Sequence, residues 1–270
     1  MQFFLVLTLV GNVFATTKDE VRDNYLKDSL SLLLYDHLYL VTKNLADGTI
    51  HYTRSVNFKF NPSTGLITHG NEALQGYAMS GSKKHTNYVD IKIPINDVIP
   101  PQASTLITFD SVNLSASDRA PSNTNFSQTN PVSYNLSSVS MFYDTNGNPH
   151  TLLIYYVKTT TPNTWKIYLV MGDNTIASGT ATFNAANGTL SQITGLNNII
   201  VHIDNRDQNL KLDLSAITQY GTQDNPGIAT MDGYNTGNYS GFAIDGFGVI
   251  FAEYTNGMSN PVSKIAMINN

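Results

Sequence analysis

Cysteine is absent from the 270-residue chain, which excludes disulfides, zinc–thiolate sites, iron–sulfur clusters and cysteine nucleophiles. Charged residues are scarce: Asp, Glu, Lys and Arg make up 13% of the chain, against a usual share of about 25%. The net charge is −5, and the 15 basic residues are scattered along the chain. No basic stripe is available to neutralise phosphates, so we expect no nucleic-acid partner.

The chain also lacks an apolar run of the roughly 20 residues that a membrane-spanning helix requires, so no membrane span is expected. The shorter apolar run at residues 3–15 resembles a secretory signal, with Val13 and Ala15 at the small-residue positions, although no basic residue precedes it. Residues 1–15 are therefore either such a signal or an apolar segment packed in the fold. Next, Thr17 and Glu20 form a capping box that predicts a short helix over residues 18–27.

Neutral polar residues are abundant instead. The sequence contains 30 Asn, 29 Thr and 22 Ser, together with 19 Gly and 10 Pro. This composition is typical of strands joined by many turns, and it predicts an all-β fold. Trp165, Ile167, Leu169 and Met171 lie at alternate positions, which indicates a strand that buries one face and therefore the ring of Trp165.

Hairpins are predicted wherever two apolar runs flank residues that tolerate positive φ. The predicted hairpin turns are at residues 47–48, 61–65, 146–149, 187–188 and 245–248. Residues 111–138, which are rich in Ser, Asn, Thr and Pro, are expected to form a long surface loop.

Two polar breaks, at residues 80–87 and 221–227, indicate the domain organisation. They separate a middle unit from the two pieces that flank it. We expect an outer β-domain, a barrel or sandwich over residues 88–224, inserted into a discontinuous inner domain formed by residues 16–87 and 225–270.

Motifs that carry chemistry are few. The sequence has no nucleophile elbow, zinc-protease motif, phosphate loop or dinucleotide fingerprint, and its six His occur singly. Asp144, Asn146 and Asn148 have the spacing that begins a calcium loop, but Tyr155 stands at the twelfth position, where the loop requires Glu. A hairpin turn is therefore the preferred interpretation of these three residues.

Asp204 and Asp207, beside His202 and Arg206, form a candidate carboxylate pair for glycoside hydrolysis. A turn between two apolar runs explains the same residues without chemistry. We therefore predict no catalytic, cofactor-binding or metal-ligating residues and no cofactor, and we do not expect an enzyme.

Several short motifs in combination resemble the bacterial flagellar hook and rod protein family. The motifs are YTRSVNF at residues 52–58, GLI at 65–67, LQGY at 74–77, GFAID at 241–245, GVI at 248–250 and YTNG at 254–257. The stretch between Tyr134 and Trp165 resembles the outer β-domain that hook-type members carry and rod-type members lack. The likeness covers roughly residues 28–270.

This resemblance implies a structural subunit with an inner and an outer β-domain. Its expected location is the extracellular hook of the bacterial flagellum, the curved joint that transmits torque from motor to filament. Its expected partners are other hook-type subunits and neighbouring flagellar proteins. The resemblance places no nucleophile or metal ligand in the chain.

The sequence also departs from the family pattern. The family's D-G-N-G-F-F stretch falls on residues 34–39, where both glycines are replaced, and Val56 stands at another family glycine. The long terminal helices through which such proteins polymerise are not recognisable, so the isolated chain is expected to be monomeric. The alternative function is a secreted β-sandwich binding module, either an adhesin or a carbohydrate-binding domain.

Overall fold

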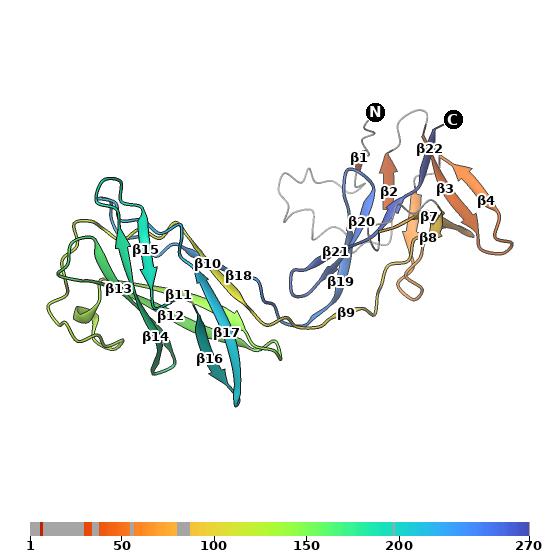
Figure 1. The fold of residues 1–270 in the computed structure, drawn as a ribbon. Coiled ribbons are helices and arrows are strands. Elements are labelled where there is room, and N and C mark those ends of the chain that lie inside the picture. The colour runs from red at the N-terminus through yellow and green to blue at the C-terminus, as the bar shows by residue number, and fades with distance from the viewer. Residues whose placement is uncertain are drawn as a thin grey trace. The chain divides into compact units, whose positions relative to one another are not determined.

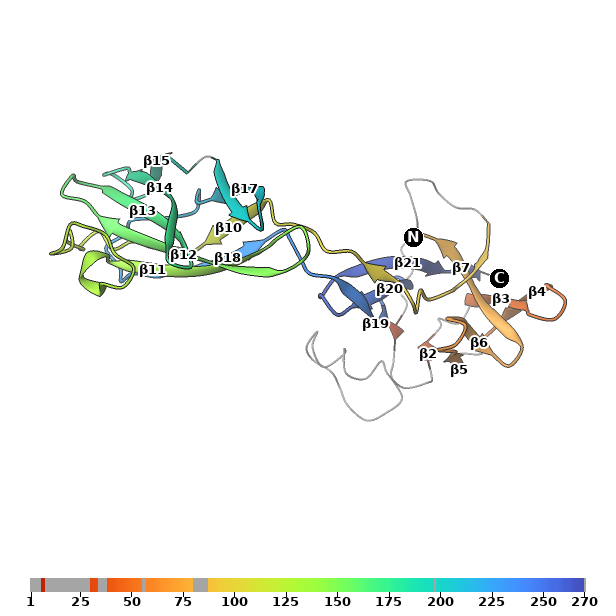
Figure 2. The ribbon, with the colours of Figure 1, turned by 90° about the horizontal axis from the view of Figure 1, so that it is seen from below.

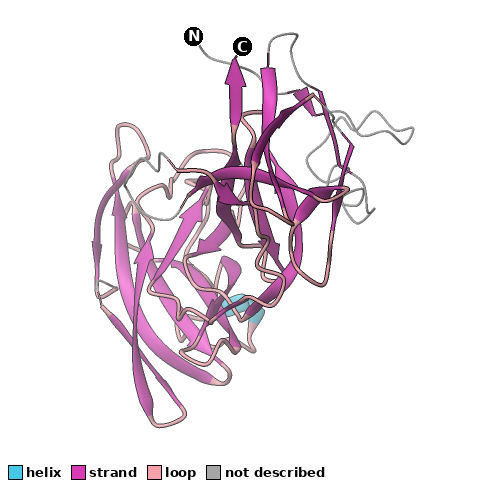
Figure 3. Ribbon diagram, turned by 90° about the vertical axis from the view of Figure 1, so that its right-hand side faces the viewer, coloured by secondary structure: helices cyan, strands magenta, loops and turns pink. Residues whose placement is uncertain are grey.

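The computed structural model describes residues 6–7, 30–33, 38–54, 57–79, 87–196 and 198–269. Across these residues the regular elements are strands, with one short 3₁₀ helix at Pro131–Ser133 (Figure 3). The all-β prediction is confirmed. Within the described ranges, no helix is long and apolar enough to cross a membrane.

Several expectations fall outside the described residues. These are the helix over residues 18–27, the segment 1–15 apart from a two-residue strand, and the family departures at Val56 and residues 34–37.

The strands form two compact units. Unit 2 runs continuously from Pro100 to Thr236, and unit 1 contains the described residues up to Ile99 and from Gly237 onward.

The strands described in unit 1 form one 13-stranded sheet (Figure 1). They are β1 (Val6–Leu7), β2 (Leu30–Leu33), β3 (Leu38–Asn44), β4 (Ile50–Thr53), β5 (Asn57–Phe60), β6 (Ile67–His69), β7 (Glu72–Ala78), β8 (Val89–Asp90), β9 (Val98–Ile99), β19 (Gly237–Ile244), β20 (Val249–Tyr254), β21 (Ser259–Ile265) and β22 (Met267–Asn269).

Strand β7 is the centre of this sheet, because it pairs with β3, β6, β8 and β21. The core of unit 1 is therefore shared by segments from both ends of the chain: Leu74 of β7 is fully buried with Leu40 of β3 and Ile265 of β21. A Cβ atom at Gly76 would collide with Ser263 and with the carbonyl oxygen of Lys264. The glycine of the LQGY motif thus allows β7 and β21 to approach closely.

The hairpin of β3 and β4 forms as predicted at residues 47–48. Gly48 has a φ of 77°, a left-handed conformation that glycine adopts without strain, and Lys43 pairs with Ile50 across the turn. The predicted turns 61–65 and 245–248 likewise join β5 to β6 and β19 to β20.

Unit 2 contains two sheets, which Figures 1 and 2 show from two directions. The five-stranded sheet is an antiparallel meander, and the four-stranded sheet has the order β16-β17-β10-β18, with β10 and β17 parallel. The strands are β10 (Leu106–Asp110), β11 (Leu136–Tyr143), β12 (Pro149–Lys158), β13 (Thr164–Met171), β14 (Asn174–Phe183), β15 (Leu190–Thr194), β16 (Ile199–Ile203), β17 (Arg206–Asp213) and β18 (Ile228–Met231).

One hydrophobic core joins the two sheets of unit 2. Trp165, Ile167 and Leu169 of β13 are fully buried in it, which confirms the period-two prediction, while Met171 is partly buried at its edge. The predicted turns at 146–149 and 187–188 join β11 to β12 and β14 to β15.

The limits of unit 2 lie further along the chain than the expected residues 88 and 224, because strand pairing continues past the polar breaks. Strand β8 pairs with β7 and β9 pairs with β19, which keeps residues 89–99 in unit 1. At the other end, β18 pairs with β10 inside unit 2.

The expected surface loop at residues 111–138 is only partly correct. Val112 and Leu114 are fully buried in the core, and β11 begins at Leu136. Asn113 exchanges backbone hydrogen bonds of 3.0 and 2.9 Å with Asn225. This short ladder was not visible in the sequence, because polar residues form it and its partner lies over a hundred positions away.

Candidate functional site

The carboxylate pair Asp204 and Asp207 lies at an exposed hairpin between β16 and β17. Asp204 and Asn205 have φ values of 47° and 62° and form the turn itself. Asp207 pairs with His202 at 2.5 Å, with side chains 62% and 76% exposed. Glycoside hydrolysis requires one carboxyl whose pKa is raised by an enclosed apolar site. Asp207 is largely exposed and therefore does not lie in an enclosed apolar site, so the turn interpretation fits the structure.

Asp144 is the buried anchor of the β11–β12 turn. Its carboxylate accepts hydrogen bonds from the backbone N–H groups of Asn146 and Asn148, at 2.8 and 2.9 Å, and from Asn148 Nδ2 and His150 Nε2, both at 3.0 Å. Burial alone would raise the pKa of Asp144, but these hydrogen bonds outweigh it and hold the pKa well below its usual range. Hydrogen-bond donors of the protein itself therefore surround the Asp144 carboxylate, as expected for a turn rather than a calcium loop.

Metal binding finds no support elsewhere in the part of the chain that the structure describes. In those residues, no group of three or more His, Cys, Asp or Glu side chains is arranged to hold an ion.

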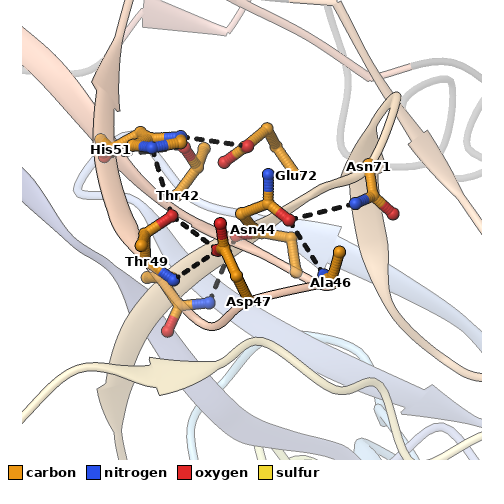
Figure 4. Close-up of polar contacts among 10 residues, drawn as sticks. Thr42, Asn44, Ala46, Asp47, Thr49, His51, Asn71 and Glu72 are labelled. Carbon is orange, nitrogen blue, oxygen red and sulfur yellow. Dashed lines mark hydrogen bonds and ion pairs between the residues drawn. The ribbon is translucent and has the colours of Figure 1, made fainter.

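A row of polar side chains crosses the β3–β4 hairpin in unit 1 (Figure 4). His51 lies between Glu72 Oε1, 3.0 Å from its Nδ1, and Thr49 Oγ1, 3.2 Å from its Nε2. The Thr49 hydroxyl donates to Asp47 Oδ1 at 2.7 Å, and this bond lowers the pKa of Asp47. The row resembles an acid–imidazole–hydroxyl triad in composition.

The direction of the hydrogen bonds gives this row a different role. The Thr49 hydroxyl has one proton, which it donates to Asp47 over 2.7 Å, a shorter contact than the 3.2 Å between Thr49 Oγ1 and His51 Nε2, so this proton is not directed at His51. Asn44 Oδ1 completes the arrangement by accepting from Ala46 N at 2.8 Å and from Asn71 Nδ2 at 3.0 Å (Figure 4). The side chains clamp two neighbouring turns together rather than activate a nucleophile.

Unit 2 contains a second polar group, which we call the Lys158 core cluster: Lys158, Asn163, Trp165 and Gln219. Gln219 Oε1 accepts from Lys158 Nζ at 2.9 Å and from Trp165 Nε1 at 2.8 Å, while its Nε2 donates to Asn163 Oδ1 at 2.9 Å. Lys158 Nζ also lies 4.8 Å from the centre of the Trp165 ring. Burial lowers the pKa of Lys158.

The sequence predicted the burial of Trp165 but not this cluster. A signal was present, because Lys158 directly follows the apolar run of residues 152–157 and is itself only 9% exposed. Gln219 had no comparable signal, since its partners lie more than 50 positions away.

An exposed apolar group lies where the edge strands β11 and β18 meet. Ser138 of β11 donates to the carbonyl oxygen of Pro226 at 2.8 Å, which ties the two edges together. Val139 and Met141 on β11 and Ile228 on β18 are 63%, 44% and 70% exposed. We call these three residues the edge patch. Exposed apolar side chains beside unpaired strand edges are suited to protein contact.

Comparison with known proteins places these features in a family context. Residues 113–234 match the family model for the flagellar basal body protein FlaE D2 domain. Over 235 residues the chain is 30% identical to flagellar hook protein FlgE of Escherichia coli (strain K12), and over 237 residues it is 29% identical to the FlgE of Salmonella typhimurium. Each alignment covers 83% of this chain and 58% of the relative, so the chain spans less than two thirds of their length.

The fold is also similar to that of a solved hook protein. The crystal structure of Helicobacter pylori flagellar hook protein FlgE2 matches with a TM-score of 0.56 at 12% sequence identity, covering 90% of this chain and 88% of that one. At this identity the match demonstrates a shared fold. The resemblance described from the sequence motifs is therefore confirmed in sequence and in fold.

Proposed function

This chain is related to the flagellar hook proteins across both of its units, and we propose that it is a structural subunit of the hook, the curved joint that transmits torque from motor to filament. The observation that carries the proposal is the coincidence of two boundaries: the D2 family match, residues 113–234, lies within the compact unit that runs from Pro100 to Thr236. We assign unit 2 to the outer hook-type domain and unit 1 to the inner one.

The surface chemistry supports a role in assembly. The edge patch offers apolar side chains on the proposed outer domain, where contacts with other subunits or neighbouring flagellar proteins would form. Elsewhere the high content of Asn, Thr and Ser suits wet polar contacts that can exchange partners. We propose that the isolated chain is monomeric, which light scattering coupled to size exclusion measures; a concentration-independent oligomer would contradict this.

The test is to purify hook–basal bodies from the source organism. Mass spectrometry should find peptides of this chain in them, and gold-labelled antibody against unit 2 should decorate the hook in electron micrographs. Antibody pre-absorbed with the purified chain is the control. Absence of the chain from hooks that are otherwise intact would overturn the proposal. The relatives named above are all hook proteins, which gives the adhesin alternative no support.

We also propose that residues 1–15 are a secretory signal, so that strand β1 and its pairing with β2 would be absent from the mature protein. This proposal rests on the apolar character of residues 1–15 and on Val13 and Ala15 at the small-residue positions. The mature protein should then begin at Thr16, which mass spectrometry of its N-terminal peptide tests. A mature chain that retains Met1 or Gln2 would exclude cleavage.

A further inference from the structure

The Lys158 core cluster brings an amine and a carboxamide into direct contact in the interior of unit 2. Lys158 ends β12 of the five-stranded sheet, and Gln219 lies on the connection between β17 and β18 of the other sheet. The two residues are 9% and 7% exposed, and Nζ lies 2.9 Å from Oε1. Because a C=O bond is about 1.2 Å long, Nζ is no more than about 4 Å from the carboxamide carbon Cδ.

We propose that Lys158 and Gln219 join through an intramolecular isopeptide bond. The inference rests on the contacts of the cluster and is independent of the proposed role in the hook. Reactive geometry requires about 3–3.5 Å between the attacking and accepting atoms. A side-chain movement of less than about 1 Å therefore brings Nζ from its hydrogen-bonded position to attack distance.

Neighbouring groups are placed to assist each stage. The indole N–H of Trp165 donates to Oε1 at 2.8 Å, so it can stabilise the negative charge that develops on this oxygen during attack. Asn163 Oδ1 accepts from Nε2 at 2.9 Å and orients the departing amide nitrogen. Burial keeps competing water away from the carbon.

Lys158 must lose a proton from its ammonium group before it can attack. Burial lowers the pKa of Lys158 and so favours the neutral amine, whereas the charge of Asp118 acts in the opposite direction. The end of β12 is held in place by Asn135, whose Oδ1 accepts from Lys158 N at 2.8 Å.

The reaction is balanced without a further reactant. The ammonium group of Lys158 releases one proton to solvent, and Nζ then forms a bond to Cδ of Gln219. The Cδ–Nε2 bond then breaks, and Nε2 leaves as ammonia with the protons it carries and the one that Nζ gives up on forming the amide. No electron acceptor is required. The product ties β12 to the β17–β18 connection, and so links the two sheets of unit 2 covalently.

Intact-mass spectrometry of the full chain under denaturing conditions tests the proposal. The expected mass is that of the sequence minus one ammonia, and proteolysis should release one branched peptide that contains Lys158 and Gln219. Lys158→Arg and Gln219→Met should each restore the full sequence mass, whereas Lys43→Arg, at the half-buried Lys43–Asp90 ion pair of unit 1, should retain the deficit. Trp165→Phe, which replaces the indole by a smaller ring without an N–H group, should slow the loss of ammonia.

The native chain itself decides the outcome, so no variant has to fold for the test to be valid. A full sequence mass after prolonged incubation of folded protein would overturn the proposal and leave the pair as a hydrogen bond. An ammonia deficit that maps to Asn residues, or that persists in Lys158→Arg, would overturn it equally.

Discussion

His150 donates a hydrogen bond from Nε2 to Asp144 Oδ2 over 3.0 Å, behind the turn that joins β11 and β12. The ring of Phe142 stacks against His150, with 5.3 Å between ring centres. Asp144 also belongs to the calcium-like motif noted in the sequence, but in the structure this motif forms the hairpin turn.

Replacing Asp144 with Asn should destabilise unit 2. The new amide would place N–H donors against Asn148 Nδ2 and His150 Nε2, which also donate, at a cost of about 1–3 kcal/mol. Chemical denaturation monitored by Trp165 fluorescence measures the loss. Asp204→Asn is the matched control, since that exposed turn residue has positive φ, which Asn tolerates, and should change stability by less than about 0.5 kcal/mol. Equal effects of the two substitutions would contradict the role of Asp144.

The contribution of Asp144 should depend on pH in the acid range. Its folded-state pKa is depressed below the value of about 3.9 expected in the unfolded chain. The stabilisation is therefore complete above about pH 5 and is lost as the pH falls through the folded-state pKa. The difference in unfolding free energy between wild type and Asp144→Asn should shrink below about pH 4. A difference that stays constant down to about pH 2 would show that ionisation of Asp144 is not the cause.

Truncation of the single tryptophan should affect the two units unequally. Trp165 is fully buried in the core of unit 2, and removing a buried ring usually costs about 3–5 kcal/mol. In Trp165→Ala, hydrogen exchange followed by mass spectrometry should show lost protection in β11–β15 and retained protection in β7, β20 and β21. Native wild-type emission should lie to the blue of the unfolded chain. Simultaneous loss of protection in both units would refute this arrangement.

Two glycines of unit 1 allow the cost of backbone strain to be measured separately from the cost of a steric clash. Gly65 and Gly48 have φ values of 76° and 77°, so alanine meets the same backbone strain at each, roughly 1–2 kcal/mol. A Cβ at Gly65 would collide with the carbonyl oxygen of Ile93, whereas at Gly48 it meets no described atom within 4 Å. Gly65→Ala should therefore lower the melting temperature of unit 1 clearly more than Gly48→Ala. Equal shifts would mean that the contact with Ile93 is readily relieved.

The edge patch should matter for assembly and not for folding. Val139→Thr and Ile228→Thr each retain a β-branched side chain at a largely exposed position, so stability should change by less than about 0.5 kcal/mol. If the patch contacts another subunit, incorporation of the double variant into hooks, measured by quantitative mass spectrometry, should fall. Val201, fully buried on β16, is a contrasting position where the same substitution should destabilise the fold. Unchanged incorporation would mean that the edge patch does not contact another subunit.

Local chemistry made the hairpins predictable. In Asp47-Gly48 and Asn187-Gly188 the glycine adopts positive φ, and an apolar run stands on each side of the turn, so the neighbouring strands pair without knowledge of the rest of the chain. The burial of Trp165 followed in the same way from period-two alternation, since a strand has only two faces. The family resemblance additionally implied an inner and an outer domain. The polar breaks at residues 80–87 and 221–227, however, do not coincide with the limits of the two compact units.

Long-range pairing could not be predicted, because strand periodicity specifies which face is buried but not which strand lies alongside. Asn113 could not be recognised as a buried ladder residue without Asn225, nor Gln219 as the acceptor for Lys158 and Trp165. A buried polar group is stable only when its partner is in place, and that partner is supplied by the packing of two sheets. Composition and alternation were therefore sufficient for the all-β class and its turns, whereas the contacts that give unit 2 its polar interior arise only where segments distant in sequence meet.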